Sequence, residues 1–360
     1  MDHSAKKQDY TLLFLVLFLV CFGLITLYST SAYNGRVKFD DSGYYFKKQL
    51  FATSIGIALM YFISRVDYHI FDRFAVAGYF ISLVLSTLVL LVGDSYNGSK
   101  RWLSLGPLSF QPSEFAKLAV ILFLAHMVCN MKKKRNSILQ LFLVLGLVLP
   151  IVGLVGTNNL STAIIILGIA VILVFVSDSR YIQFVWMGGI GVAFVAIFLS
   201  LESYRLERLA IWRDPENYEK GFQTIQGLYA IGSGGLFGKG LGESIQKLGF
   251  VPEAQNDMIF SIICEELGLA GATILVIVFI TLIWRFMVVA THATDLLGSL
   301  IVVGIMGHIA IQVILNVAVV TNTIPNTGIT LPFISYGGTS VMFLLAEMGL
   351  ALSVSRWQKK

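Results

Sequence analysis

The sequence predicts an all-α polytopic membrane protein with ten transmembrane helices. Of its 360 residues, 56% are hydrophobic and only 13% are charged, whereas an ordinary soluble domain carries about 25% charged residues. Long charge-free stretches recur along the chain, and a helix needs about 20 apolar residues to cross the hydrocarbon core of a bilayer. This composition excludes a soluble globular enzyme, a disordered chain and a disulfide scaffold.

The ten expected spans follow the charge-free stretches in chain order. The first runs from about residue 10 to residue 32. It is too long for a signal-peptide core and lacks a convincing cleavage site, so we expect it to remain as an anchor. The second to fourth are expected at 49–64, 74–93 and 111–130. The charge-free stretch 136–177 is too long for one span, and a Thr-Asn-Asn break at 157–159 divides it into the fifth and sixth. The last four are expected at 181–201, 267–284, 296–320 and 337–355.

Both termini are predicted to lie in the cytoplasm. Ten spans put the termini on one side, where the short loops and helix ends hold 13 Lys and Arg residues, against seven on the opposite side. Cytoplasmic loops carry the excess of Lys and Arg, and the run Lys132–Arg135 is the strongest single marker. A large extracellular loop at 201–266 then joins the seventh and eighth helices, within a single membrane domain at 1–360.

The net charge does not indicate nucleic-acid binding, and the cysteine positions do not indicate a metal site. The formal charge of +5 is expected of a membrane protein whose Lys and Arg residues set its orientation. Cys21, Cys129 and Cys264 lie in or beside apolar runs without metal-ligand spacing. We interpret them as reduced packing residues.

The first polar feature of the outer face leads into the fourth span. Lys100, Arg101 and Trp102 precede the span, and Glu114 and Lys117 lie inside it. Residues at i and i+3 share a helix face, so these last two are expected to pair. An ion pair at membrane depth is costly and indicates function; the alternative is a structural pair that fixes helix packing.

The second feature is the long loop. It opens with a charged amphipathic stretch at 202–213. The glycine-rich stretch at 232–240 lacks the phosphate-loop pattern and is expected to form a tight loop that folds back on the bilayer. Asp257 lies where polar sequence meets apolar sequence, so partial desolvation should raise its pKa toward the range of a general base. The alternative is an N-cap aspartate of the eighth span.

The third feature is the irregular segment 325–340 before the last span. Irregular backbone at membrane depth survives only where protein buries it or where it lines a cavity. The hydroxyls of Ser335, Tyr336 and Thr339 suit a sugar or a pyrophosphate, and the alternative is a re-entrant packing loop. His126, His308 and Glu347 also lie within spans and receive no role.

Together these segments resemble the shape, elongation, division and sporulation (SEDS) family of bacterial membrane proteins. The matching segments are 100–102 with 111–117, 232–240, 256–260 with 265–268, and 328–340, in the order of the family. The turn at 327–336 is more similar to the division and sporulation branch (FtsW, SpoVE) than to the elongation branch (RodA). Residues 159–162 and 255–256 depart from the usual family pattern.

The resemblance implies a peptidoglycan glycosyltransferase. Such an enzyme polymerises lipid II into glycan strands on the outer face of the bacterial cytoplasmic membrane, for cell division or cell shape. Asp257 matches the essential aspartate of the family and is the expected catalytic base. The residues expected to bind substrate are Lys100, Arg101, Trp102, Glu114, Lys117, Ser335, Tyr336 and Gly337.

The resemblance also implies partners. A class B penicillin-binding protein would supply the transpeptidase that this chain lacks, beside other membrane proteins of the divisome or elongasome. A divalent cation, Mg²⁺ or Mn²⁺, is the one cofactor considered, at the pyrophosphate, although the sequence shows no ligand cluster. Two other functions stay open: a lipid II flippase with Glu114 and Lys117 as an intramembrane relay, and a non-catalytic scaffold for the penicillin-binding protein.

Overall fold

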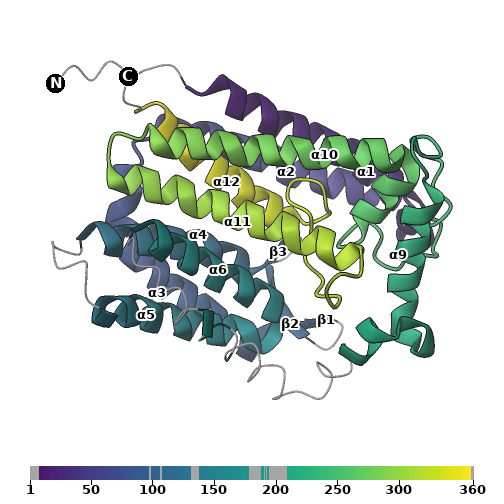
Figure 1. Ribbon diagram of the computed structural model, residues 1–360, viewed down its shortest axis with the longest axis horizontal. Coiled ribbons are helices and arrows are strands. Elements are labelled where there is room, and N and C mark those ends of the chain that lie inside the picture. Colours follow the sequence, from purple (N-terminus) through teal and green to yellow (C-terminus); the bar gives the residue numbers. More distant parts are fainter. Residues whose placement is uncertain are drawn as a thin grey trace.

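The computed structural model is a bundle of helices that run side by side along its long axis (Figure 1). It describes residues 8–96, 99–105, 108–130, 138–177, 188–189, 191, 193 and 209–357. The described helices are α1 (Tyr10–Phe39), α2 (Tyr44–Arg65), α3 (His69–Val92), α4 (Pro112–Asn130), α5 (Ile138–Asn158), α6 (Leu160–Ser177), α9 (Phe222–Ser233), α10 (Ile259–Thr291), α11 (Leu296–Val320) and α12 (Gly338–Ser355), with short 3-10 turns η1 (Pro215–Asn217) and η2 (Glu219–Gly221).

Most of the predicted spans are helices of the bundle. Among the described residues, α1, α3, α4, α6, α10, α11 and α12 are long and apolar enough to cross a membrane. The second and fifth predicted spans are the helices α2 and α5, and the predicted break at 157–159 is where α5 ends and α6 begins. The predicted seventh span, 181–201, and the charged stretch 202–208 lie almost wholly outside the described residues.

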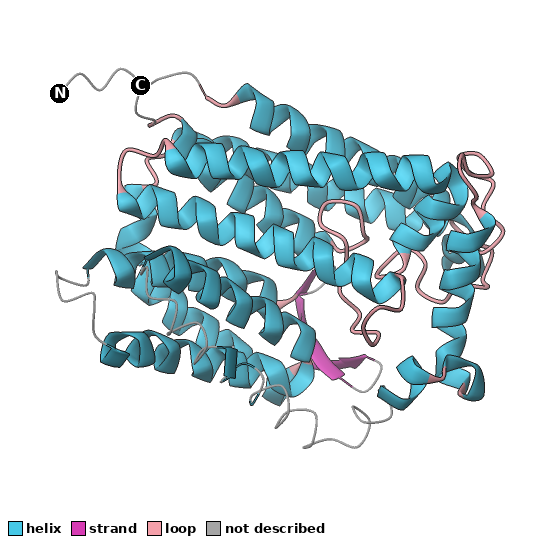
Figure 2. Cartoon of the chain, in the orientation of Figure 1, coloured by secondary structure: helices cyan, strands magenta, loops and turns pink. Residues whose placement is uncertain are grey.

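The structure adds a small sheet that the all-α prediction omits. Three antiparallel strands, β1 (Asp94–Tyr96), β2 (Ser99–Leu105) and β3 (Leu108–Phe110), pair in the order β1-β2-β3 between α3 and α4 (Figure 2). Leu103 lies opposite Phe110 in the ladder, and apolar cross-strand pairs of this kind stabilise short hairpins. The segment expected to be a simple loop therefore carries a defined backbone into the start of α4.

Burial separates the helices into a centre and a rim. The apolar windows of α4, α11 and α12 are 67%, 67% and 78% buried, whereas those of α3 and α10 are only 28% buried. The rim helices expose large apolar side chains such as Phe74, Leu91, Ile274 and Trp284. Because this much exposed apolar surface suits hydrocarbon rather than water, the polar residues of the three central helices are the ones that need partners inside the protein.

A break in α10 explains the glycine-rich stretch of the long loop. Gly268 has φ 68° and ψ −171° inside the helix, so the backbone groups before it lose their helical partners. The loop supplies new ones, because Lys239 N donates to Glu265 O and Gly240 N donates to Glu266 O, each at 2.9 Å. The stretch thus packs on the break in α10, where the sequence alone suggests a loop that folds back on the bilayer.

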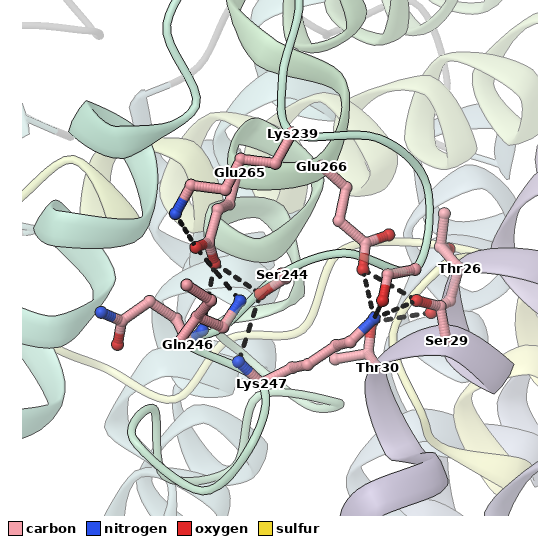
Figure 3. Close-up of polar contacts among 11 residues, drawn as sticks. Thr26, Ser29, Thr30, Lys239, Ser244, Gln246, Lys247, Glu265 and Glu266 are labelled. Atoms are coloured by element: carbon pink, nitrogen blue, oxygen red, sulfur yellow. Dashed lines mark hydrogen bonds and ion pairs between the residues drawn. The ribbon is translucent and has the colours of Figure 1, made fainter.

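Two ion pairs fasten the same loop to α10 (Figure 3). Lys239 Nζ lies 2.6 Å from Glu265 Oε1, and Lys247 Nζ lies 2.6 Å from Glu266 Oε1. Ser29 of α1 donates to the Glu266 carboxylate at 2.8 Å and accepts from the Lys247 ammonium at 2.9 Å. Both glutamates are buried, and a buried carboxylate needs such partners. The two pairs therefore hold the loop, α1 and the first segment of α10 together.

We predict that Gly268→Ala destabilises the protein strongly. Its backbone lies in a region that only glycine adopts easily, at a cost of about 1–3 kcal/mol for another residue. An alanine Cβ would also lie 2.3 Å from Gly238 N. The midpoint of thermal unfolding in detergent should fall by several degrees.

Gly78→Ala is the matched control. Gly78 is a helical residue of α3, and a Cβ there meets nothing within 4 Å. Alanine in a helix interior is more stable than glycine by about 0.5–1 kcal/mol, so this variant should unfold at the same or a higher temperature. Equal midpoints for the two variants would contradict the structural role of the break.

Candidate functional site

Asp257 lies at the end of the long loop, two residues before α10 begins at Ile259. It is 8% exposed, and Gln223 of α9 donates from Nε2 to Asp257 Oδ1 at 3.4 Å. The N-cap position of α10 belongs to Met258, so the structure does not give Asp257 the cap role that the sequence left open. Its carboxylate is instead held at the junction of the loop with the helix bundle.

The turn between α11 and α12 packs against this aspartate. Asn316 of α11 donates from Nδ2 to Asp257 O at 2.9 Å and to Ile329 O at 2.7 Å. The backbone N–H of Tyr336 donates to Gln255 O at 2.9 Å. Two of the polar features that the sequence presents separately therefore form one structural unit.

Gly328 brings the turn closest to the carboxylate. It has φ 69°, a conformation that favours glycine, and a Cβ built there would lie 3.9 Å from Asp257 Oδ2. Asn326 of the same turn donates to Gln223 Oε1 at 3.3 Å. Gln223 thus contacts both the aspartate and the turn, and it fixes their separation.

The predicted ion pair of α4 is present. Lys117 Nζ lies 3.0 Å from Glu114 Oε1, and the two side chains are 2% and 7% exposed. Lys117 also donates to Gln312 Oε1 of α11 at 3.5 Å, and Gln312 Nε2 donates to Thr330 O at 3.0 Å. The pair is therefore linked to the turn that packs on Asp257.

A polar stripe on α11 joins the two groups, and the sequence analysis missed its role. His308, Gln312 and Asn316 are 1%, 2% and 0% exposed. Their four-residue spacing puts them on one helix face. The signal was available, because three polar residues at this spacing interrupt an otherwise apolar span.

The structure gives Lys100 and Arg101 contacts with helix ends. Lys100 Nζ lies 3.4 Å from the carbonyl oxygens of Leu90 and Leu91, at the end of α3. Arg101 Nε donates to Asn158 O at 2.9 Å, at the end of α5. Cations are favoured at carboxyl-terminal helix ends, where carbonyls lack helical partners. In this structure the two cations anchor the hairpin to the bundle.

A small cleft lies beside these cations. Its volume of about 20 Å³ suits about one water molecule. The cleft is lined by Lys100 and Arg101 together with Ser113 of α4 and Asn159. Trp102 pairs with Asp94 in the sheet and is half-buried. The hairpin therefore reaches the first turn of α4 at Ser113, four residues before Lys117.

Ser335 and Gly337 are used to fold the turn. The Ser335 hydroxyl accepts from Leu331 N at 2.8 Å, and Gly337 N donates to Gln49 Oε1 of α2 at 3.0 Å. The ring of Tyr336 lies edge-on to Tyr45, with 5.0 Å between centroids. Ser335 and Gly337 thus help to fold the turn, as the packing-loop alternative expects, and their part in substrate binding stays a prediction.

The comparisons with known proteins cover nearly the whole chain. The family model for the FtsW/RodA/SpoVE cell cycle proteins matches residues 10–360. The chain is 43% identical to the stage V sporulation protein E of Bacillus subtilis, over 100% of both sequences. It is 35% identical to a probable peptidoglycan glycosyltransferase FtsW of Trichlorobacter lovleyi, over 97% of this chain and 93% of that protein.

Solved structures share the fold. A chain from the structure of a peptidoglycan synthase complex that coordinates polymerization and crosslinking superposes with a TM-score of 0.82 at 30% identity, over 98% of this chain and 99% of that one. The rod shape determining protein RodA of Thermus thermophilus superposes with a TM-score of 0.72 at 28% identity, over 98% of each chain.

We predict that Lys117→Met destabilises the protein by about 3 kcal/mol, because it leaves the buried Glu114 carboxylate without its cation. The double variant Glu114→Gln with Lys117→Met should recover most of that loss, since neither partner is then charged. Unfolding of the wild type, both single variants and the double variant in detergent measures the coupling. Additive effects of the two substitutions would contradict the prediction.

Proposed function

The chain belongs to the FtsW/RodA/SpoVE family of cell cycle proteins, and we propose that it is a peptidoglycan glycosyltransferase that polymerises lipid II into glycan strands. It is a multi-pass helical membrane protein with a RodA-like fold. The observation that carries the proposal is the position of Asp257, 8% exposed, between the end of the long loop and the turn before α12. The family match spans both segments.

Asp257 acts as the general base of the transfer. It removes the proton from the 4-hydroxyl of the acceptor sugar, and that oxygen attacks the anomeric carbon of the donor as lipid pyrophosphate leaves. A single inverting displacement needs one base and no enzyme nucleophile. Asp257 is 8% exposed and accepts a hydrogen bond from Gln223 at 3.4 Å, and a positioned carboxylate of this kind supports the role.

Cationic side chains neutralise the pyrophosphate as its charge develops. Lys117 serves this purpose from α4, and Glu114 holds it in place at 3.0 Å. Lys100 and Arg101 add their charge to that of Lys117. To do so, they leave the helix-end carbonyls that they contact in this structure and bind phosphate oxygens. Trp102, Ser335, Tyr336 and Gly337 complete the substrate-binding surface, with the last three shaping the turn.

No step of this mechanism passes through a protein-bound metal. Within the described ranges, no group of three or more His, Cys, Asp or Glu side chains is arranged to hold a metal ion. The divalent cation considered from the sequence, Mg²⁺ or Mn²⁺, stays a proposal, in which the pyrophosphate oxygens would supply most of its ligands.

We further propose ten spans in the bacterial cytoplasmic membrane, with both termini cytoplasmic and the site facing outside. Asp9 N donates to Ser355 Oγ at 3.2 Å, so the start of α1 and the end of α12 share one end of the bundle. The turn before α12, the start of α10 and the helix α9 lie toward the other end (Figure 1). The excess of Lys and Arg on the terminus side supports this orientation.

A class B penicillin-binding protein is the proposed partner, together with other membrane proteins of the divisome or elongasome. The solved relative with a TM-score of 0.82 is part of a peptidoglycan synthase complex that couples polymerization to crosslinking. A partner of this kind would supply the crosslinking activity beside the polymerase.

The orientation predicts which side of the membrane each loop faces. In a variant with Cys21, Cys129 and Cys264 replaced by alanine, a cysteine introduced at the exposed Glu243 should react with a membrane-impermeant maleimide on intact cells. A cysteine introduced at Lys134 should react only after the cells are permeabilised. The reverse pattern would overturn the orientation, and labelling of both on intact cells would overturn the span count.

Polymerisation of purified lipid II tests the proposed function, with and without a cognate class B penicillin-binding protein. Asp257→Asn and Asp257→Ala should each lower the rate by at least about 100-fold, since a positioned base contributes about that much or more. Gel separation of the labelled glycan products measures the chain length and the rate.

Glu243→Gln is the control, because it removes an exposed carboxylate of the same loop and should polymerise as the wild type does. All variants are compared at equal amounts of folded protein. Normal glycan synthesis by Asp257→Asn would remove the base from the mechanism. A wild type that makes no glycan with its partner would redirect the question to lipid II transport across liposomes.

A further inference from the structure

The centre of the bundle holds four buried titratable side chains, of which the mechanism above uses only two. Glu114 and Lys117 come from α4, His308 from α11 and Glu347 from α12, and they are 6%, 2%, 1% and 0% exposed. Ionisable residues at membrane depth are costly and usually functional. His308 and Glu347 therefore require an explanation of their own.

The amide of Gln312 can be oriented from its partners. Its nitrogen must be the atom 3.0 Å from Thr330 O, because a carbonyl oxygen only accepts. Its oxygen then faces Lys117 Nζ at 3.5 Å and His308 Nε2 at 2.9 Å. An amide oxygen also only accepts, so His308 must carry a proton on Nε2 and donate it to Gln312.

Glu347 fixes that protonation state. His308 Nδ1 lies 2.8 Å from Glu347 Oε2, so one proton is shared between the ring and the carboxyl group. Either the acid donates to Nδ1 or the ring is protonated on both nitrogens, and Nε2 keeps its proton in both arrangements. If the neutral ring carried its proton on Nδ1 alone, His308 Nε2 and Gln312 Oε1 would both be acceptors and could not form a hydrogen bond. A carboxylate behind a histidine commonly selects the tautomer in this way.

We propose that His308 and Glu347 are positioning residues that hold Gln312, and through it Lys117 and Thr330, in the geometry of the transfer step. This inference rests on the polymerase proposal, in which Lys117 meets the pyrophosphate. The link continues along α11, because Asn316 binds both Ile329 O, next to Thr330, and Asp257 O. Through the stripe, Lys117, the cation on the leaving-group side, and Asp257, the base on the acceptor side, are both connected to the same turn.

Two carboxamide substitutions at His308 separate this role from simple packing. The side-chain nitrogen of His308→Gln reaches the position of Nε2 and can still donate to Gln312. The side chain of His308→Asn reaches only the position of Nδ1, so it keeps a contact with Glu347 and loses the donor to Gln312. Both are neutral amides that remove the imidazole.

Steady-state kinetics with purified lipid II, beside wild type and Asp257→Asn, measure kcat/KM for each variant. His308→Gln should stay within about threefold of wild type, whereas His308→Asn should lose about tenfold or more, the scale of one lost hydrogen bond. Equal effects of the two substitutions, or a larger loss for His308→Gln, would overturn the proposal. Those outcomes leave the polymerase proposal intact, because that proposal is tested by wild type against Asp257→Asn.

A second pair of variants covers a failure of His308→Asn to fold, judged by its unfolding midpoint in detergent. Glu347→Gln still offers a partner to Nδ1 and leaves the proton on Nε2, so it should keep kcat/KM within about threefold. Gln312→Met has a similar shape and no amide, and it should lose about tenfold or more. Equal kcat/KM for this pair would overturn the proposal in the same way.

Discussion

The site depends on one constraint: backbone polar groups that leave helical structure in a bilayer must find partners inside the protein. The turn between α11 and α12 is such a segment, and amide side chains satisfy it. Gln312 donates to Thr330 O, Asn316 donates to Ile329 O, and Gln49 donates to Ser335 O at 3.4 Å. Because Asn316 also binds Asp257 O, the same bonds that make the turn tolerable place the aspartate.

The same constraint recurs at the break in α10, and it is met there by a different device. Glycines allow the loop backbone to reach the carbonyls that the break leaves without helical partners. The ion pairs of Glu265 with Lys239 and of Glu266 with Lys247 hold the loop in this position. The first segment of α10 is therefore held at both ends, by the turn beside Asp257 and by the loop beside Gly268. An aspartate at the start of such a segment has little freedom to move, which is what a positioned base requires.

The sequence predicts the parts of the fold that hydrophobicity determines. Charge-free stretches locate the described helices except α9, which lies within the predicted long loop. The i,i+3 spacing of Glu114 and Lys117 predicts a pair that the structure contains. The hairpin of β2 and β3 was missed, since short strands have little periodicity. Lys100 and Arg101 show a second limit, because a cation next to a membrane helix can bind the end of that helix as well as a ligand. No local pattern reveals which of these a given side chain does.

Charge balance explains why four ionisable groups are tolerated at the centre of the bundle. Glu114 and Lys117 form a neutral pair, and His308 and Glu347 share one proton and are also neutral together. Gln312 lies between the pairs and passes hydrogen bonds from one to the other without adding charge. An acidic residue in its place would neutralise Lys117 a second time and weaken its attraction for a pyrophosphate. A neutral amide leaves that attraction intact and still fixes the direction of the ammonium group, so the arrangement orients the cation at little electrostatic cost.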